Sequence, residues 1–474
     1  MLPGVALSQG LRKPGAPLNH PSLNYWSPFI SFDGQRMLFL SDLNDEQSPS
    51  LFYTSKTGGD WKEPTPLSKS INAGFNFQDG FSISADSKSI YVSIQRAGGL
   101  GGYDIIACEI KPDGIGMGIN PGAPINSKEH DASLVFTPDG NTLYLMRCQT
   151  MSATSCNNCR ILTAQRKQNG QWESPVELPE KINKGNAQFP RIMSDGRTLI
   201  FSSDRHAPNQ GGMDLYLSRL EGGQWSDPLP LNFLNTELDE RIVSATASGR
   251  YVMLSKKGKT KQELVEIPFP PELKPAAVLR INGAVSGVTE TAAYINVYDK
   301  YTGEKRYSAR TDSNGNFQLF LAEGSVYYLI IDPADDHLKF DSKVIDLKTG
   351  PINVTEKISF NLVPVNSGSE VLLSGIELDS LGGKLLPGSI QVLNRLSRFI
   401  QGNNQLKFSL DFSISTDTAN SAQEAIDLLA ITRLKDSVES NLRGKNLKNL
   451  TDFSIQVIPG KDSNRNPVVT LKTE

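Results

Sequence analysis

Short apolar strands alternate with Asp-Gly-type turns along the first half of the chain, in a phrase that occurs five times. Each phrase is an apolar strand, a turn and a second apolar strand, as in FISFDGQRMLFLS at 29–41 and LVFTPDGNTLYLM at 134–146. The turn positions, separated by 53, 53, 56 and 53 residues, are Asp33, Asp86, Asp139, Asp195 and Ser248. A fixed period of about 50 residues with strand chemistry in every unit is typical of a β-propeller.

Three further segments recur after the hairpins: a Gly-rich loop, a tryptophan turn and an Asn-bearing stretch. In the third repeat the Gly-rich loop is replaced by SATSCNNC at 152–159. The segment 1–25 holds no complete repeat, but it is similar to the stretch after the tryptophan in later repeats, such as QWSDPLPLNFLNTELDE at 224–240. We therefore expect the N-terminal segment to supply the outer strand of the last sheet, which closes a five-bladed propeller over 1–270.

The hydrophobic pattern changes after the Pro-rich stretch at 267–275. Residues 276–364 hold short strands at roughly ten-residue spacing, which predicts a β-sandwich of about seven strands. Residues 370–474 change again, because apolar residues recur there at helical spacing. Helices are predicted at 388–402 and 420–442, and strands at 405–414, 453–459 and 467–473. The chain is thus predicted to be multidomain and mainly β, with an α/β domain last.

Composition narrows the function only slightly. Of 474 residues, 21% are charged and 38% apolar, which is ordinary for folded domains. The formal net charge of −3 gives no support for nucleic-acid binding, which usually shows a basic stripe. No apolar run approaches the ~20 residues of a transmembrane helix. The start MLPGVALSQG lacks a cationic region, so it is not a complete signal peptide.

The four cysteines are unevenly placed. Cys108 stands alone, whereas Cys148, Cys156 and Cys159 fall within one predicted hairpin. A disulfide between Cys148 and either Cys156 or Cys159 is the favoured prediction, and it suits an oxidising envelope compartment. The alternatives are free thiols, or half of a zinc site that lacks a second Cys/His pair at the usual spacing.

Catalytic motifs are not visible. The histidines lie in four different segments without metal-ligand spacing, at His20, His130, His206 and His337. Neither a Gly-x-Ser-x-Gly elbow nor a phosphate-binding Gly-x-x-x-x-Gly-Lys-Ser/Thr loop occurs. We therefore predict a protein that is not an enzyme and needs no cofactor or metal. A propeller lyase or hydrolase that uses scattered carboxylates is the alternative.

The repeat phrase SSDRHAPNQGGMDLY at 202–216 resembles the WD-repeat-like propellers of the TolB type, which implies that Asp104 and Asp214 hold the blades together. The middle segment, with INGAVSG at 281–287 and a Tyr-Thr-Gly turn, resembles the carboxypeptidase regulatory-like sandwich. That resemblance implies a structural hairpin and its core anchor, made by Thr311, Asp312, Asn314, Gly315 and Phe317.

The last segment resembles the OmpA-like peptidoglycan-binding module in degenerate form. The family strand ends in Gly-His-Thr-Asp and its helix carries Asn-x-x-Leu-Ser-x-x-Arg; here Asp417 and Arg433 match, while the Gly, His, Asn and Ser do not. Arg465, in Asn-Arg, resembles a late family motif. The resemblance implies that the Asp and Arg bind the ammonium and carboxylate of the diamino acid in peptidoglycan.

The order of propeller, regulatory-like sandwich and OmpA-like module resembles PorE-type envelope proteins of the type IX secretion and gliding machinery. Those proteins also carry a helical-repeat domain and a lipoprotein cysteine, so we expect a truncated or shortened relative. The resemblance implies a periplasmic, outer-membrane-associated scaffold that contacts a secretion or gliding complex and peptidoglycan, with no transmembrane segment. The alternative within binding proteins is a propeller that recognises glycan or peptide, with a purely structural last domain.

Overall fold

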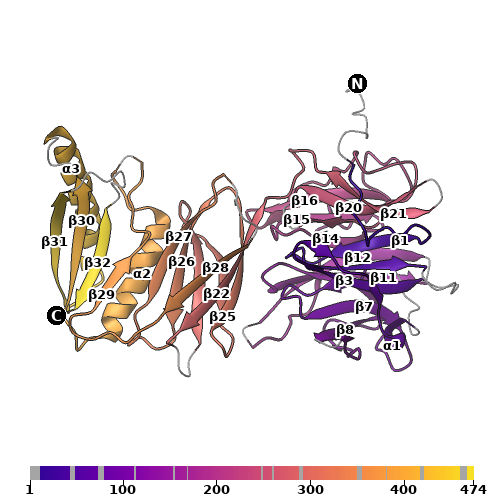
Figure 1. Cartoon of the computed structure of the whole chain (residues 1–474), viewed down its shortest axis with the longest axis horizontal. Helices are drawn as coiled ribbons and strands as arrows, with labels where there is room; N and C mark the ends of the chain where they lie inside the picture. Colours follow the sequence, from indigo (N-terminus) through magenta and orange to yellow (C-terminus); the bar gives the residue numbers. More distant parts are fainter. Residues whose placement is uncertain are drawn as a thin grey trace. The chain divides into compact units, whose positions relative to one another are not determined.

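The computed structural model describes residues 11–42, 49–72, 80–111, 114–152, 155–167, 169–246, 249–258, 261–287, 292–349, 355–380, 382–416, 421–459 and 467–473. The chain forms two compact units, 1–278 and 279–474 (Figure 1). Most regular elements of both units are β-strands. Among the described residues, no helix combines the length and the apolar character needed to cross a membrane.

The described part of the first unit contains five antiparallel sheets that follow one another along the sequence. The first sheet comprises β1 (Tyr25–Ile30), β2 (Arg36–Ser41), β3 (Ser50–Thr57), β4 (Asp60–Trp61) and β5 (Thr65–Pro66), and is followed by the short helix α1 (Lys69–Asn72). The second comprises β6 (Ser82–Ile83), β7 (Ser89–Gln95), β8 (Tyr103–Lys111) and β9 (Gly114–Ile115). The third comprises β10 (His130–Phe136), β11 (Thr142–Met151), β12 (Cys156–Gln165) and β13 (Val176–Glu177).

The last two sheets of this unit repeat the pattern. The fourth comprises β14 (Gln188–Ile192), β15 (Thr198–Ser203), β16 (Asp214–Glu221), β17 (Gln224–Trp225) and β18 (Leu229–Pro230). The fifth comprises β19 (Ser244–Ala245), β20 (Tyr251–Lys257) and β21 (Gln262–Pro268). Each predicted turn joins the first and second strand of its sheet, and the turn residue Ser248 lies outside the described residues.

A backbone kink recurs six residues before the turn aspartates. Ser27, Ser133 and Phe189 have φ of 52°, 52° and 49°, and Gly80 has φ of 112°. The register shifts at these kinks in β1, β10 and β14, as in a β-bulge. A bulge bends its strand and changes the direction of the next side chains. Glycine is required at position 80, because an added Cβ would lie 2.7 Å from the Cβ of Ser133.

The N-terminal segment joins the last sheet, as the sequence predicted. Arg12 forms an isolated antiparallel bridge with Glu266 of β21, with N–H···O bonds in both directions of 2.9 and 2.8 Å. Leu18 and Tyr25 share one buried apolar cluster with Met253 and other side chains of the fifth sheet. The first and last sheets of the unit are therefore neighbours, which leaves no open edge between them.

The second unit begins with seven strands in two sheets. One sheet has the order β25-β22-β28, from β22 (Val278–Ser286), β25 (Asn316–Ala322) and β28 (Thr355–Asn361). The other has the order β24-β23-β26-β27, from β23 (Ala293–Asp299), β24 (Lys305–Arg310), β26 (Val326–Pro333) and β27 (Asp341–Asp346). One apolar cluster draws side chains from both sheets, which is the packing of a β-sandwich.

The predicted hairpin of this sandwich is present. Asp312 accepts hydrogen bonds from the backbone N–H of Asn314 and Asn316, at 2.9 and 2.8 Å. Gly315 takes a positive φ of 78° in the turn. Phe317 is buried and faces Gly283, where an added Cβ would lie 2.0 Å from the ring. These residues hold the turn and anchor it in the core.

The remaining elements alternate strand and helix: β29 (Glu370–Leu373), α2 (Pro387–Gly402), β30 (Phe408–Thr416), α3 (Ser421–Arg443), β31 (Leu450–Pro459) and β32 (Val468–Thr473). The strands form one sheet in the order β29-β32-β30-β31, with β30 and β31 parallel. The helices lie close to their predicted positions. The strand β29 was not located in the sequence, because four residues carry little periodicity.

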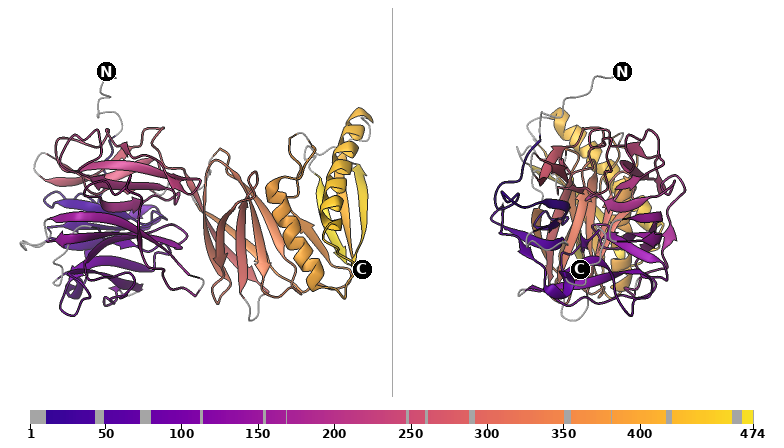
Figure 2. Two further views of the ribbon diagram at one scale, coloured as in Figure 1. Left: turned by 180° about the vertical axis from the view of Figure 1, so that it is seen from behind. Right: turned by 90° about the vertical axis from the view of Figure 1, so that its right-hand side faces the viewer.

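Helix α2 connects the sandwich to this last sheet within the second unit. It lies between the two in Figure 1 and in the left view of Figure 2. One apolar cluster joins Tyr328 and Phe340 to α2 and β30. Arg395 of α2 is 1% exposed, and its Nε lies 2.5 Å from Asp332 while its Nη2 lies 3.3 Å from Asp336. Residues 279–474 are therefore one compact unit, and separate domains at 276–364 and 370–474 stay a prediction.

Candidate functional site

The centre of the first unit is formed by the first strand of each sheet. In the described residues β1 contacts β6 and β19, and β10 contacts β6 and β14. Hydrogen bonds cross between the sheets: the N–H of Ile30 donates to Ser244 Oγ at 2.9 Å, and Ser82 Oγ donates to the Leu134 carbonyl. The mouth of a propeller enzyme would lie at this centre, so its side chains decide what it can hold.

Arg191 occupies the centre. Its side chain is 3% exposed, and its guanidinium carbon lies 5.1 Å from the centre of the Phe29 ring. The guanidinium also makes long hydrogen bonds to Ser133 Oγ, at 3.4 Å, and to the Phe81 carbonyl, at 3.5 Å. One arginine from the fourth sheet thus contacts the first three sheets.

Sequence reasoning missed Arg191, although a signal was present. Arg191 lies four residues before its turn aspartate, and the equivalent residues in the other repeats are uncharged: Phe29, Ser82, Val135 and Ser244. A charged residue at an apolar or small repeat position indicates a special contact.

The space beside Arg191 is a cavity of about 20 Å³ lined by 29–32, 191–194 and 244–246. These lining residues include no carboxylate.

The turn aspartates do not converge on this centre, because each binds its own turn. Asp139 accepts the N–H of Asn141 at 3.1 Å, and Asp195 accepts the N–H groups of Arg197 and Thr198 at 3.0 and 2.9 Å. Among the described residues, the only three His, Cys, Asp or Glu side chains close enough to share a metal ion are cysteines.

The aspartates of the Gly-rich loops bind groups of their own repeats, and a role in holding the blades together stays a prediction. Asp104 is buried and accepts the N–H of Leu100 at 2.7 Å and the side-chain amide of Asn120 at 2.8 Å. Asp214 is buried and accepts the N–H of Gln210 at 2.5 Å and that of Gly211 at 3.1 Å. Both carboxylates close their own loops.

The histidines lie in separate environments. His206 is buried, its Nε2 lies 3.2 Å from the Ile182 carbonyl, and its ring packs 4.9 Å from that of Tyr216. Burial lowers the pKa of His206, because desolvation disfavours the charged ring. His130 accepts the Tyr103 N–H, and His337 contacts Asn403 Oδ1 at 3.2 Å. Each contact holds a loop or a helix end rather than a shared site.

Of the predicted peptidoglycan-binding residues, Asp417 and Arg465 lie outside the described residues. Arg433 is exposed on α3, and its Nη1 passes close to Gly382. Sequence reasoning missed Asp427, which is buried. Its carboxylate accepts hydrogen bonds from Thr416 Oγ1 at 2.6 Å and from Gln423 Nε2 at 2.8 Å. Asp427 thereby ties the last residue of β30 to α3.

An open groove of about 540 Å³ lies between α2, α3 and the loop before α2. Its lining combines charged, polar and apolar side chains, from Gly383, Lys384, Leu385, Ile390, Asp436, Ser437, Ser440 and Asn441. Asp436 follows Arg433 on the same helix by three residues, so the groove and Arg433 share one side of this part of the unit. Polar groups of both charges lie there.

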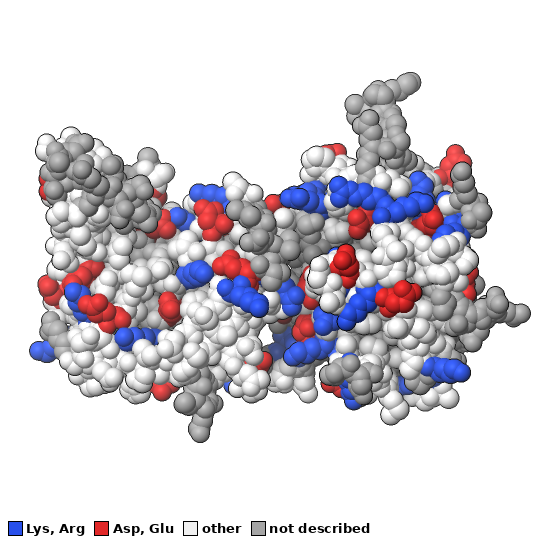
Figure 3. Space-filling model, viewed as in Figure 1, with Lys and Arg blue, Asp and Glu red and all other residues white. Residues whose placement is uncertain are grey.

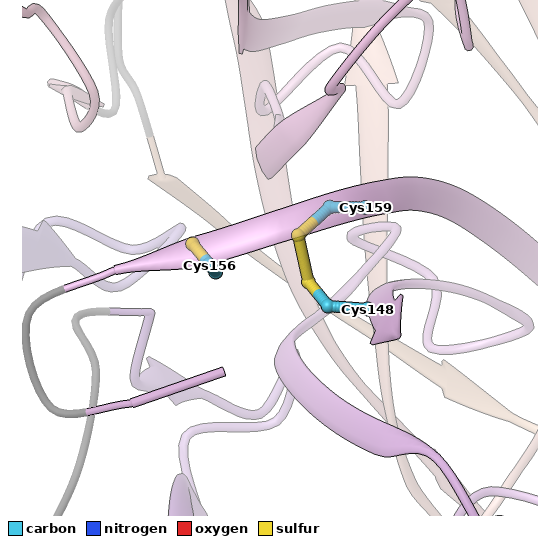
Figure 4. Close-up of side chains that lie close together, drawn as sticks. All are labelled: Cys148, Cys156 and Cys159. Atoms are coloured by element: carbon cyan, nitrogen blue, oxygen red, sulfur yellow. A yellow bond between two sulfur atoms is a disulfide. The ribbon is translucent and has the colours of Figure 1, made fainter. Parts of the chain in front are cut away.

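The structure joins Cys148 to Cys159, which is one of the two pairings that the sequence left open (Figure 4). The two residues are direct cross-strand neighbours on β11 and β12, with Cα atoms 4.0 Å apart. The disulfide thus links the two strands of the hairpin in which SATSCNNC replaces the Gly-rich loop. Cys108 lies elsewhere, and burial raises the pKa of its thiol to about 11.

Charged side chains of both signs are interspersed over the face in Figure 3, in keeping with the small net charge of −3.

No family model matches the sequence, and neither does any curated protein. Among solved structures, the chain is similar to a TolB structure from Agrobacterium tumefaciens, at 15% identity and a TM-score of 0.32, over 65% of this chain and 82% of that one.

Two enzyme structures are similar to the same degree. An oligogalacturonate lyase from Vibrio parahaemolyticus has 10% identity and a TM-score of 0.34, over 56% of this chain and 96% of that one. An α-L-arabinofuranosidase from Podospora anserina has 12% identity and a TM-score of 0.33, over 55% of this chain and 95% of that one. At such TM-scores the function has to be inferred from the residues themselves.

Proposed function

We propose that this chain is a non-enzymatic scaffold of the cell envelope, periplasmic and associated with the outer membrane, within a type IX secretion or gliding complex. In this proposal the five sheets of the first unit are the blades of a five-bladed propeller that docks a protein partner. The sandwich acts as a spacer, and the OmpA-like module over 370–474 binds peptidoglycan through Asp417, Arg433 and Arg465.

The observation that carries the scaffold role is the small size of the cavity beside Arg191 in the first unit. Small-molecule sites in proteins usually measure about 300–1,000 Å³. The cavity beside Arg191 measures about 20 Å³, which is room for a water molecule rather than a sugar ring. A buried arginine beside so small a cavity supports a rigid docking body over a lyase or hydrolase.

The exposure of Arg433 supports the peptidoglycan-binding role. A guanidinium binds a carboxylate through two parallel hydrogen bonds, so an exposed arginine beside a groove suits an amino acid carboxylate. Asp427 holds Thr416, the last residue of β30, against α3.

A specific feature of the second sheet supports protein docking. Met117 and Ile119 are 83% and 72% exposed, and Ile119 pairs with Ala107 at the outer edge of this sheet. Residues two apart on an extended segment point to the same side. Two large apolar side chains exposed together at a sheet edge favour contact with another protein.

Co-sedimentation of the full chain with purified peptidoglycan sacculi tests the proposal. We expect the parent protein to pellet with the sacculi and Arg433→Ala to lose most of this binding. Arg443→Ala is the matched control, because Arg443 is an exposed arginine on the same helix that is paired with Glu439. Failure of the parent protein to pellet, or equal binding by Arg433→Ala, would refute the peptidoglycan-binding role.

A further inference from the structure

Three sulfur atoms meet in the third sheet of the first unit. The Sγ atoms of Cys148, Cys156 and Cys159 all lie within 4.8 Å of one another, and two of them form the disulfide (Figure 4). All three cysteines are buried, at 0%, 4% and 2% exposure. The disulfide accounts for the positions of Cys148 and Cys159, and Cys156 adds a third sulfur beside it.

The backbone of β12 places Cys156 beside the pair. Residues three apart on a regular strand point to opposite faces of the sheet, so Cys156 and Cys159 would ordinarily diverge. Asn158 lies between them with φ of 50°, in the left-handed region that asparagine tolerates better than most residues. This kink interrupts the alternation, and the two sulfur atoms come together on one side. The strained residue thus serves the convergence of the sulfur atoms.

An apolar, sulfur-rich cluster surrounds part of this group. The buried cluster around the three cysteines contains Ala132, Met146 and Phe189, and Met151 packs against it. Among the described residues, no imidazole or carboxylate belongs to this ligand group. Donor sets made only of thiolate and thioether sulfur select soft ions such as Cu(I). Zn²⁺ is nearly always four-coordinate in structural sites, whereas this group supplies three thiols.

We propose that the reduced form of this hairpin binds one Cu(I) ion through Cys148, Cys156 and Cys159. A dithiol reductant breaks the Cys148–Cys159 bond: two electrons and two protons pass to the two sulfur atoms, and the reductant closes to its own disulfide. The ion then enters as Cu(I), without a change of oxidation state, and displaces thiol protons to water. Oxidation to the disulfide removes two of the three ligands, so copper binding is coupled to the redox state.

Competition with a chromophoric Cu(I) chelator tests this proposal on the full chain. The protein is first reduced with a dithiol. The dithiol is then removed under anaerobic conditions, and the reduced protein is titrated with Cu(I). We expect one tightly bound ion per reduced chain and none on the oxidised chain. Cys156→Ser should weaken binding at least tenfold. Cys108→Ser is the matched control, because Cys108 is an equally buried thiol of the second sheet, and it should bind like the parent.

X-ray absorption at the copper edge separates loss of a ligand from loss of the fold. We expect three sulfur neighbours around copper in the parent chain and two in any residual complex of Cys156→Ser. A reduced chain that binds no Cu(I), equal affinity of Cys156→Ser and the parent, or a complex without three sulfur neighbours would overturn the proposal.

Discussion

Asn19 holds Leu264, a residue 245 positions away, through both of its backbone groups. The Asn19 side chain accepts the Leu264 N–H and donates to the Leu264 carbonyl, each at 2.8 Å. The same two-way clip is made by one asparagine in each of the other sheets to its third strand; the pairs are Asn72 with Leu51, Asn126 with Ile105, Asn183 with Ile161, and Asn235 with Leu215. The N-terminal segment thus gives the fifth sheet the same asparagine contact to its third strand that the other four sheets have.

Replacement of Asn19 tests how much this closure contributes. In Asn19→Ala the backbone N–H and carbonyl of Leu264 lose their partner, which should cost about 1–3 kcal/mol of the free energy of unfolding. Calorimetry should show a lower Tm for the first unit, and hydrogen exchange should show faster exchange of the Leu264 amide. Asn169→Ala is the control, because this exposed turn residue should change stability by less than about 0.5 kcal/mol. Equal effects of the two changes would contradict a closing role.

Arg191 should stabilise the first unit mainly by filling its centre. Arg191→Ala removes a large buried side chain and leaves a cavity, with an expected loss of about 2–4 kcal/mol. Arg191→Met keeps most of the volume and should lose clearly less, because apolar replacements of buried charges are often tolerated. Urea denaturation compares the two. If Arg191→Met were as damaging as Arg191→Ala, the charge rather than the volume would be the stabilising feature.

Arg395 should control the attachment of α2 to the sandwich. In Arg395→Met, Asp332 loses its buried partner, and breaking such a pair costs about 3–5 kcal/mol. Amide exchange in α2 should then accelerate at residues that are well protected in the parent. Arg398→Met is the matched control, since Arg398 also contacts Asp332 but its side chain is 63% exposed, so little change is expected. Unchanged exchange in Arg395→Met would rule out this attachment.

The first unit should lose stability on mild acidification through His206. Burial lowers the pKa of this ring in the folded state, so the unfolded chain binds its proton more readily. The stabilisation is complete above the unfolded pKa of about 6.5 and is lost as the pH falls from there toward the folded pKa. His206→Gln should reduce the fall in Tm between about pH 7 and 5, whereas His20→Gln, at an exposed site, should not. The same pH dependence in both variants would exclude His206 as the cause.

Features that depend on neighbours along the chain can be predicted from the amino-acid sequence. Turn positions, strand pairs, the sandwich strands and helices α2 and α3 follow from short-range periodicity and turn chemistry, which act over a few residues. The similarity of the first segment to later repeats also predicted the closure onto the last sheet. The peptidoglycan-binding role that the resemblance implies for Arg433 stays a prediction.

Which distant side chains meet depends on how the sheets and helices pack in three dimensions. The unusual charge at position 191 indicates a special contact, but the local pattern does not say that Arg191 contacts three other sheets or that Arg395 binds Asp332 across the second unit. Such contacts depend on how whole sheets and helices pack. The choice of Cys159 over Cys156 as the partner of Cys148 likewise depends on strand register and on the kink at Asn158. Register and packing are set by the burial of many side chains at once, and the pattern of neighbours along the chain does not contain that sum.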